Sequence, residues 1–147
     1  MLVYPQVRSP LASWLLTVFT GGIYLVFWFW RVANELNSAE NKNVFDVGLW
    51  RSSFFALLLL AVAGFAITAS TKNPMLLLVS ILGLFGLCLH VQVTIGNYIK
   101  SKDNGLATGK SYSNGVSVTL LWLGASLGVA YMQSGINRII EHERAHS

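Results

Sequence analysis

The sequence predicts an all-α membrane protein with four transmembrane helices, a short interfacial segment after the first helix and an amphipathic C-terminal extension. Of its 147 residues, 54% are hydrophobic and 11% are charged, whereas a soluble domain usually carries about 25% charged residues. So few charges cannot solvate a globular surface. We expect a single integral membrane domain over residues 1–147, with spans at about residues 11–32, 52–70, 75–98 and 116–135.

The first span, residues 11–32, carries only one charged residue, Arg31. At about 1.5 Å per residue, a helix of this length crosses a hydrocarbon layer roughly 30 Å thick. Trp28 and Trp30 stand near its end, and tryptophan favours the membrane–water boundary. The Arg31 side chain can extend past that boundary into the headgroups.

Two adjacent glycines, Gly21 and Gly22, lie in the middle of this span. Small residues let the backbones of neighbouring membrane helices approach closely, so the first interpretation is a packing surface. The alternative is a kink or a local break of the helix.

A hydrophilic connection follows at residues 33–50. It mixes charges of both signs with apolar residues such as Phe45 and Trp50, which is typical of a segment lying on the membrane surface. The second span, residues 52–70, is apolar. Pro74 then ends a tight turn and begins the third span, because proline is favoured at the first position of a helix.

The second half of the third span is polar and contains His90, Gln92, Thr94 and Asn97. Our main interpretation of His90 is a neutral histidine bonded to another helix, with no cofactor, although an ionisable group inside a membrane is a functional candidate. One alternative is an oligomeric channel or transport component, because His90, Thr94 and Asn97 lie nearest one helix face. A second alternative is a haem or chlorin ligated by His90, for which the small Gly86, four residues earlier, leaves room.

The fourth span, residues 116–135, contains Gly124 and Gly128 in a G-x-x-x-G pattern. In an apolar span this pattern predicts a helix-packing face. The face serves either a contact within the chain or self-association with a second copy. The helix is expected to continue beyond the span as an amphipathic extension into a charged tail.

The charged tail contains His142, Glu143 and His146 in the order H-E-x-x-H. In zinc peptidases this spacing places two histidine ligands on one helical face, with the glutamate as general base. Here the motif lies in a terminal turn, where helices fray, and no third ligand follows. We therefore interpret it as a chance match and predict neither enzymatic activity nor a metal site.

Two groups of residues at opposite ends of the chain form a recognisable pair of motifs. They are T-G-G-I-Y at residues 20–24 with Trp28 and E-L-N at residues 35–37, and Q-S-G-I-N at residues 133–137. The pair resembles a bacterial family of small multi-pass membrane proteins, the domain of unknown function forty-two thirty-four, which has T-x-G-I-Y-x-x-x-W, E-L-N and a Q-x-x-x-N ending. The resemblance implies a multi-pass protein of the bacterial inner membrane and brings no activity with it.

The amides in these motifs are spaced to share helix faces. Gln133 and Asn137 are four residues apart, and Asn34 and Asn37 are three apart. Such amides cap carbonyls or bridge neighbouring helices, for about 1 kcal/mol or less each. The alternative is a polar site for a lipid headgroup or an ion.

The charge pattern bears on partners and orientation. The formal charge of +4 suits anionic lipid headgroups, but it is too scattered for nucleic acid. Basic residues favour the cytoplasmic side, which puts both termini outside the cytoplasm. The side of the two long connections would hold Arg31, Lys42, Arg51, Lys100, Lys102 and Lys110, and the side of the termini Arg8, Lys72, Arg138 and Arg144.

Acidic residues are absent from all four apolar segments, which argues against a carrier that moves protons through membrane carboxylates. We therefore expect a non-enzymatic integral membrane protein. Its partners would be membrane lipids and either another membrane protein, to which it is an accessory subunit, or a second copy of itself.

Overall fold

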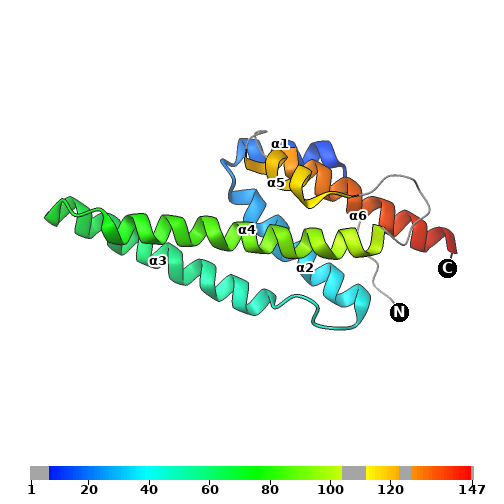
Figure 1. The fold of residues 1–147 in the computed structure, drawn as a ribbon, viewed down its shortest axis with the longest axis horizontal. Coiled ribbons are helices and arrows are strands. Elements are labelled where there is room, and N and C mark those ends of the chain that lie inside the picture. Colours follow the sequence, from blue (N-terminus) through cyan, green and yellow to red (C-terminus); the bar gives the residue numbers. More distant parts are fainter. Residues whose placement is uncertain (1–6, 104–111, 123–126, 147) are drawn as a thin grey trace. The chain divides into compact units, whose positions relative to one another are not determined.

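The computed structural model describes residues 7–103, 112–122 and 127–146 (Figure 1). Within these ranges it contains helices and short connections and no strand, which confirms the all-α prediction. The helices are α1 (Pro10–Phe19), α2 (Ile23–Glu40), α3 (Val47–Thr71), α4 (Met75–Asp103), α5 (Asn114–Trp122) and α6 (Leu127–His146). Contacts divide the chain into two compact units, Asp46–Val91 and the combination of Met1–Phe45 with Gln92–Ser147.

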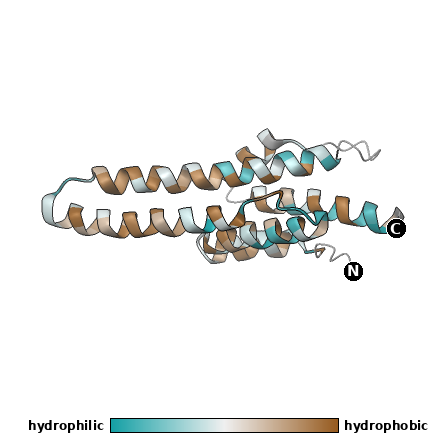
Figure 2. Ribbon diagram, turned by 90° about the horizontal axis from the view of Figure 1, so that it is seen from below, coloured by the Kyte–Doolittle hydropathy of each residue, from teal (hydrophilic) through white to brown (hydrophobic). Residues whose placement is uncertain are grey.

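The Asp46–Val91 unit is a pair of apolar helices. It contains α3, of 25 residues, and the first part of α4, which has 29 residues in all. At 1.5 Å per residue these helices are about 37 Å and about 43 Å long. Among the described residues, these are the two helices long and apolar enough to cross a membrane. Figure 2 shows hydrophobic residues along α3 and the first part of α4.

The turn between α3 and α4 is closed by local hydrogen bonds. Lys72 ends α3 in the left-handed conformation, with φ of 58°. The Thr68 hydroxyl lies 2.7 Å from the Gly64 carbonyl oxygen and 3.1 Å from that of Asn73. Asn73 Oδ1 accepts a bond of 3.1 Å from the Met75 amide, so this side chain begins α4.

The predicted single helix over residues 11–32 is wrong, because the chain breaks between α1 and α2. Gly21 and Gly22 have φ of +59° and +91°, a region that glycine enters without steric cost. The Thr20 hydroxyl donates to the Leu16 carbonyl at 2.7 Å and accepts from the Tyr24 amide at 3.0 Å, so it joins both helix ends. A Cβ at either glycine would meet no atom within 4 Å in the part of the chain that the structure describes, so the glycines make the turn and touch no neighbouring helix there.

The connection predicted over residues 33–50 also differs. Helix α2 continues to Glu40, and only residues 41–46 connect it to α3. Asp46 begins α3 by accepting a bond of 2.9 Å from the Leu49 amide. Of the residues predicted as the interfacial segment, 33–40 are therefore the polar end of α2 and 47–50 already belong to α3.

The predicted fourth span is also not one helix. Residues 114–122 and 127–146 form two helices, α5 and α6, that pack against each other. Two halves of a straight helix cannot pack in this way, and α5 alone is only about 13 Å long. Gly128 is buried in α6, while Gly124 lies outside the described residues. Two helices of spanning length are thus described where the sequence predicted four.

The unit formed by residues 1–45 and 92–147 has a core drawn from α2, the end of α4 and α6. Helices α1 and α6, which are far apart in sequence, also pack against each other in this unit. Residues less than 3% exposed include Trp28, Val32, Ile95, Ile99, Met132 and Ile140. This core positions the polar side chains described next.

Candidate functional site

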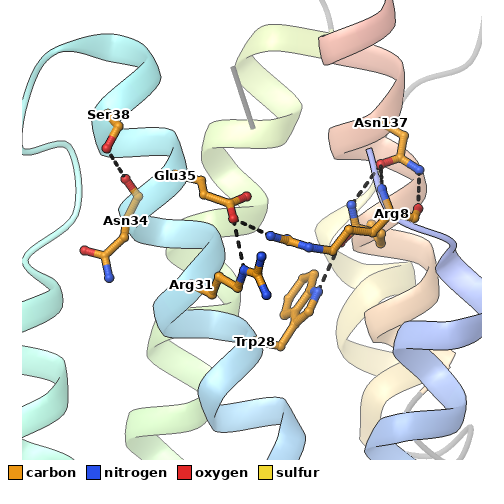
Figure 3. Close-up of polar contacts among 8 residues, drawn as sticks. Arg8, Trp28, Arg31, Asn34, Glu35, Ser38 and Asn137 are labelled. Carbon is orange, nitrogen blue, oxygen red and sulfur yellow. Dashed lines mark hydrogen bonds and ion pairs between the residues drawn. The ribbon is translucent and has the colours of Figure 1, made fainter. Parts of the chain in front are cut away.

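A chain of polar side chains connects α2 with α6 (Figure 3). The Trp28 indole donates to Gln133 Oε1 at 3.0 Å, and Gln133 Nε2 donates to Asn137 Oδ1 at 2.8 Å. Trp28 and Gln133 are buried. Buried polar groups are costly unless paired, so this chain of bonds fixes which faces of the two helices meet.

The network continues to Arg8, two residues before α1. Asn137 Nδ2 donates to the Arg8 carbonyl at 2.7 Å, and the Arg8 amide donates to Asn137 Oδ1 at 3.3 Å. The Arg8 guanidinium forms an ion pair with Glu35, which also accepts a bond of 3.2 Å from Arg31 Nε. The residues of the two terminal motifs therefore join three segments of the chain.

Asn37, the last residue of the E-L-N motif, holds the connection after α2. Its amide Nδ2 donates to the Phe45 carbonyl at 2.7 Å, and its Oδ1 accepts from the Phe45 amide at 2.8 Å. Phe45 is itself buried, and its ring meets that of Tyr98 edge-on at 5.5 Å between centroids. The connection therefore has a defined shape.

A polar hollow opens between the end of α2 and this connection. Its volume is about 390 Å³. We call it the asparagine hollow; its lining is Asn34, Asn37, Ser38, Asn41, Lys42 and Asn43. Asn34 and Asn37 were expected from their spacing to share a helix face, and the other lining residues were not predicted. The available signal was four asparagines within ten residues.

A second charged cluster lies beside the hollow, on α2 and α4. Glu40 accepts a bond of 2.7 Å from the Tyr98 hydroxyl and pairs with Lys102 Nζ at 2.5 Å. The bond from Lys102 and then that from Tyr98 lower the pKa of the Glu40 carboxyl below its ordinary value. Glu40 is therefore an ionised, paired group near neutral pH.

A buried carboxylate holds the chain before α5. Asp103 accepts from the Tyr112 amide at 2.7 Å and forms an ion pair with Arg138 at 3.0 Å. The Tyr112 ring stacks on Tyr131 at 5.1 Å, and burial raises the pKa of its hydroxyl to about 12. This cluster was not predicted from the sequence, because its members are far apart along the chain.

The polar residues of the third predicted span do not share one environment. His90 and Asn97 are exposed and Thr94 is half-buried, whereas Gln92 is buried. The His90 ring meets Trp50 edge-on at 6.4 Å between centroids. Gln92 Nε2 donates to the Ser117 hydroxyl at 3.2 Å, so Gln92 faces α5.

The two histidine positions for which the sequence suggested metal or cofactor ligation are His90 and the H-E-x-x-H motif of residues 142–146. Among the described residues, no group of three or more His, Cys, Asp or Glu side chains is placed to hold a metal ion. The His146 side chain of the H-E-x-x-H motif lies outside the described part. A Cβ at Gly86, four residues before His90, would meet no atom of the described chain within 4 Å, so there is open space beside Gly86.

Comparison of the chain with known protein families, curated proteins and solved structures finds no match. The motif resemblance described above therefore stays a prediction. The roles of Trp28, Gln133 and Asn137 depend on their contacts alone. The Trp28–Gln133 bond joins α2 with α6, the Gln133–Asn137 bond lies within α6, and Asn137 bonds to the backbone of Arg8.

Proposed function

We propose that this chain is a non-enzymatic integral membrane protein that α3 and α4 anchor across the bilayer and that binds lipid or a membrane-protein partner. The observation that carries the proposal is the exposure of these two helices. Only 6% and 17% of the residues in their apolar stretches are buried within the protein. A core helix of a soluble protein would instead be covered by its neighbours.

The exposed side chains are large as well as apolar. Leaving a Leu, Val or Phe side chain in water forgoes about 1.5–3 kcal/mol relative to burying it. Residues at least 60% exposed include Leu59, Val62 and Phe65 of α3 and Val79 and Leu82 of α4. So much apolar surface on both helices requires a cover, and lipid chains provide one along their whole length.

The helices outside this pair support a binding role. Their polar residues are used in bonds between helices, as in the Trp28–Gln133–Asn137 chain and the Asp103–Arg138 ion pair. At the end of α2, by contrast, the asparagine hollow leaves polar side chains facing solvent. Lipid headgroups and polar segments of a membrane protein are the ligands available at such a place.

Membrane fractionation tests the proposal. After cell lysis we expect the protein in the membrane pellet, where it should resist extraction with alkaline carbonate and dissolve only in detergent. Alkaline carbonate removes proteins that merely adhere to the surface. Recovery as a compact monomer in the detergent-free supernatant would contradict the proposal.

A further inference from the structure

Resting on the proposed membrane location, we infer that the asparagine hollow binds the headgroup of an anionic, hydroxyl-bearing phospholipid of the phosphoglycerol class. The hollow has no carboxylate among its lining residues and one cation, Lys42. Its other lining side chains are four amides and the Ser38 hydroxyl. This composition matches one phosphate beside a group rich in hydroxyls.

Amides suit hydroxyl groups because each amide carries two donors and one acceptor, and a hydroxyl both donates and accepts. Figure 3 shows Asn34 pointing away from the Arg8–Glu35–Asn137 network, with the Ser38 hydroxyl bonded to its backbone carbonyl. Asn34, Asn41 and Asn43 are exposed. The Asn37 amide already bonds to the Phe45 backbone through both its nitrogen and its oxygen. Asn37 therefore shapes the hollow, and the three exposed asparagines are the ones that would contact the ligand.

The hollow is built before any ligand arrives. The Asn37–Phe45 bonds fix one side, and Asn41 ends α2 in the left-handed conformation with φ of 50°. Lys102 neutralises the nearby Glu40, which would otherwise repel an anion. A site already in its bound shape loses less conformational entropy on binding, which favours affinity.

The position along the chain selects a lipid as the source of this chemistry. Asn43 stands four residues before Val47, the first residue of α3. Four residues reach at most about 14 Å, so where α3 enters the bilayer the chain keeps Asn43 within reach of the headgroups.

The test compares lipids retained by full-length protein in nanodiscs of phosphatidylcholine containing either phosphatidylglycerol or phosphatidic acid, by native mass spectrometry. We expect wild type to enrich phosphatidylglycerol over both other lipids. Asn34→Ala/Asn43→Ala should reduce that enrichment about tenfold, the equivalent of losing one or two hydrogen bonds. Lys42→Ala should reduce it too.

Asn97→Ala and Lys100→Ala are the matched controls, since each removes an exposed amide or cation outside the hollow. Helical content by circular dichroism confirms that the variants fold. Equal retention of phosphatidylglycerol and phosphatidylcholine, or unchanged enrichment in the double variant, would overturn the inference. Equal retention of phosphatidic acid would show recognition of charge alone and would also overturn it.

Soluble glycerol 3-phosphate distinguishes a lipid from a free ligand. The inference is wrong if this compound binds to the hollow while phosphatidylglycerol is not enriched. The nanodisc assay can be run only if the protein inserts into a bilayer. Its outcomes therefore test lipid binding at the hollow and not the membrane location itself. Recovery of the protein in the detergent-free supernatant after cell lysis, in contrast, would contradict the proposed function itself.

Discussion

At the scale of single residues, Glu40 shows how a paired charge makes stability depend on pH. Its bonds with Lys102 and Tyr98 favour the ionised form and lower its pKa below the ordinary value of 4.5. A carboxyl whose folded pKa is depressed stabilises the protein above its unfolded pKa. That stabilisation is lost as the pH falls through the folded value.

We therefore predict a difference between wild type and Glu40→Gln that depends on pH. In detergent micelles the wild type should melt at a higher temperature near neutral pH, and the two melting temperatures should converge as the pH falls below 4.5 and through the folded pKa. Glu141→Gln, which changes an exposed carboxyl, is the control. A gap between wild type and Glu40→Gln that stays constant down to acid pH would contradict the role of the charge.

Residue spacing predicted part of the polar network. Gln133 and Asn137 were expected to share a helix face, and they are bonded to each other at 2.8 Å. Their partners Trp28 and Arg8 could not be predicted, because both contacts join segments more than one hundred residues apart in sequence. Helical periodicity reports which residues share a face but not which helix that face meets.

At the scale of the helices, Gly64 and Gly83 of the α3–α4 pair form a natural comparison. A Cβ at Gly64 would lie 2.7 Å from the Leu77 amide nitrogen and 2.9 Å from its Cα, so backbone would have to move. A Cβ at Gly83 would lie 2.8 Å from Cδ2 of Leu57, the end of a flexible side chain. One position is closed by main chain and the other by a side chain that can rotate.

Alanine at these two positions should therefore have different effects. Gly64→Ala is expected to destabilise the protein by about 1–3 kcal/mol through overpacking. Gly83→Ala should be nearly neutral, because the Leu57 rotation is offset by a helix-propensity gain of up to about 1 kcal/mol. Thermal unfolding in one detergent measures both, and equal losses at the two glycines would refute the close backbone contact.

The helix boundaries show where hydropathy stops being informative. Residues 11–32 and 116–135 are apolar enough to resemble spans, yet the first range contains the Gly21–Gly22 turn and the second belongs to the separate helices α5 and α6. Hydropathy averages side chains along the chain and does not register a backbone turn. The glycines were the available signal, and their break was one of two interpretations that the sequence left open.

At the scale of the whole molecule, the all-helical class and the two long apolar helices followed from composition and run length. Those properties depend on many residues together, so single departures do not change them. The asparagine hollow depends instead on the left-handed conformation of one residue, Asn41, and on two hydrogen bonds between the Asn37 side chain and the Phe45 backbone. A local site of this kind follows from contacts that only the folded chain displays.

The two ends of α3 should lie on opposite sides of the membrane. Gly48 and Thr71 lie near its two ends and are exposed, and a Cβ at Gly48 would be in ordinary contact at 3.5 Å from Asp46. They are separated along the helix by about 34 Å, enough to reach both faces of a bilayer. In a Cys88→Ser background, which removes the one native cysteine, Gly48→Cys and Thr71→Cys each provide a single thiol.

A membrane-impermeant maleimide added to intact cells should label Thr71→Cys and leave Gly48→Cys unlabelled. In inverted vesicles the pattern should reverse. The orientation follows from Lys42, Lys100 and Lys102, which lie in sequence on the Gly48 side of the two helices and favour the cytoplasm. Labelling of both positions from one side would mean that α3 lies on the membrane and does not cross it, because a spanning helix separates its ends by the whole hydrocarbon layer.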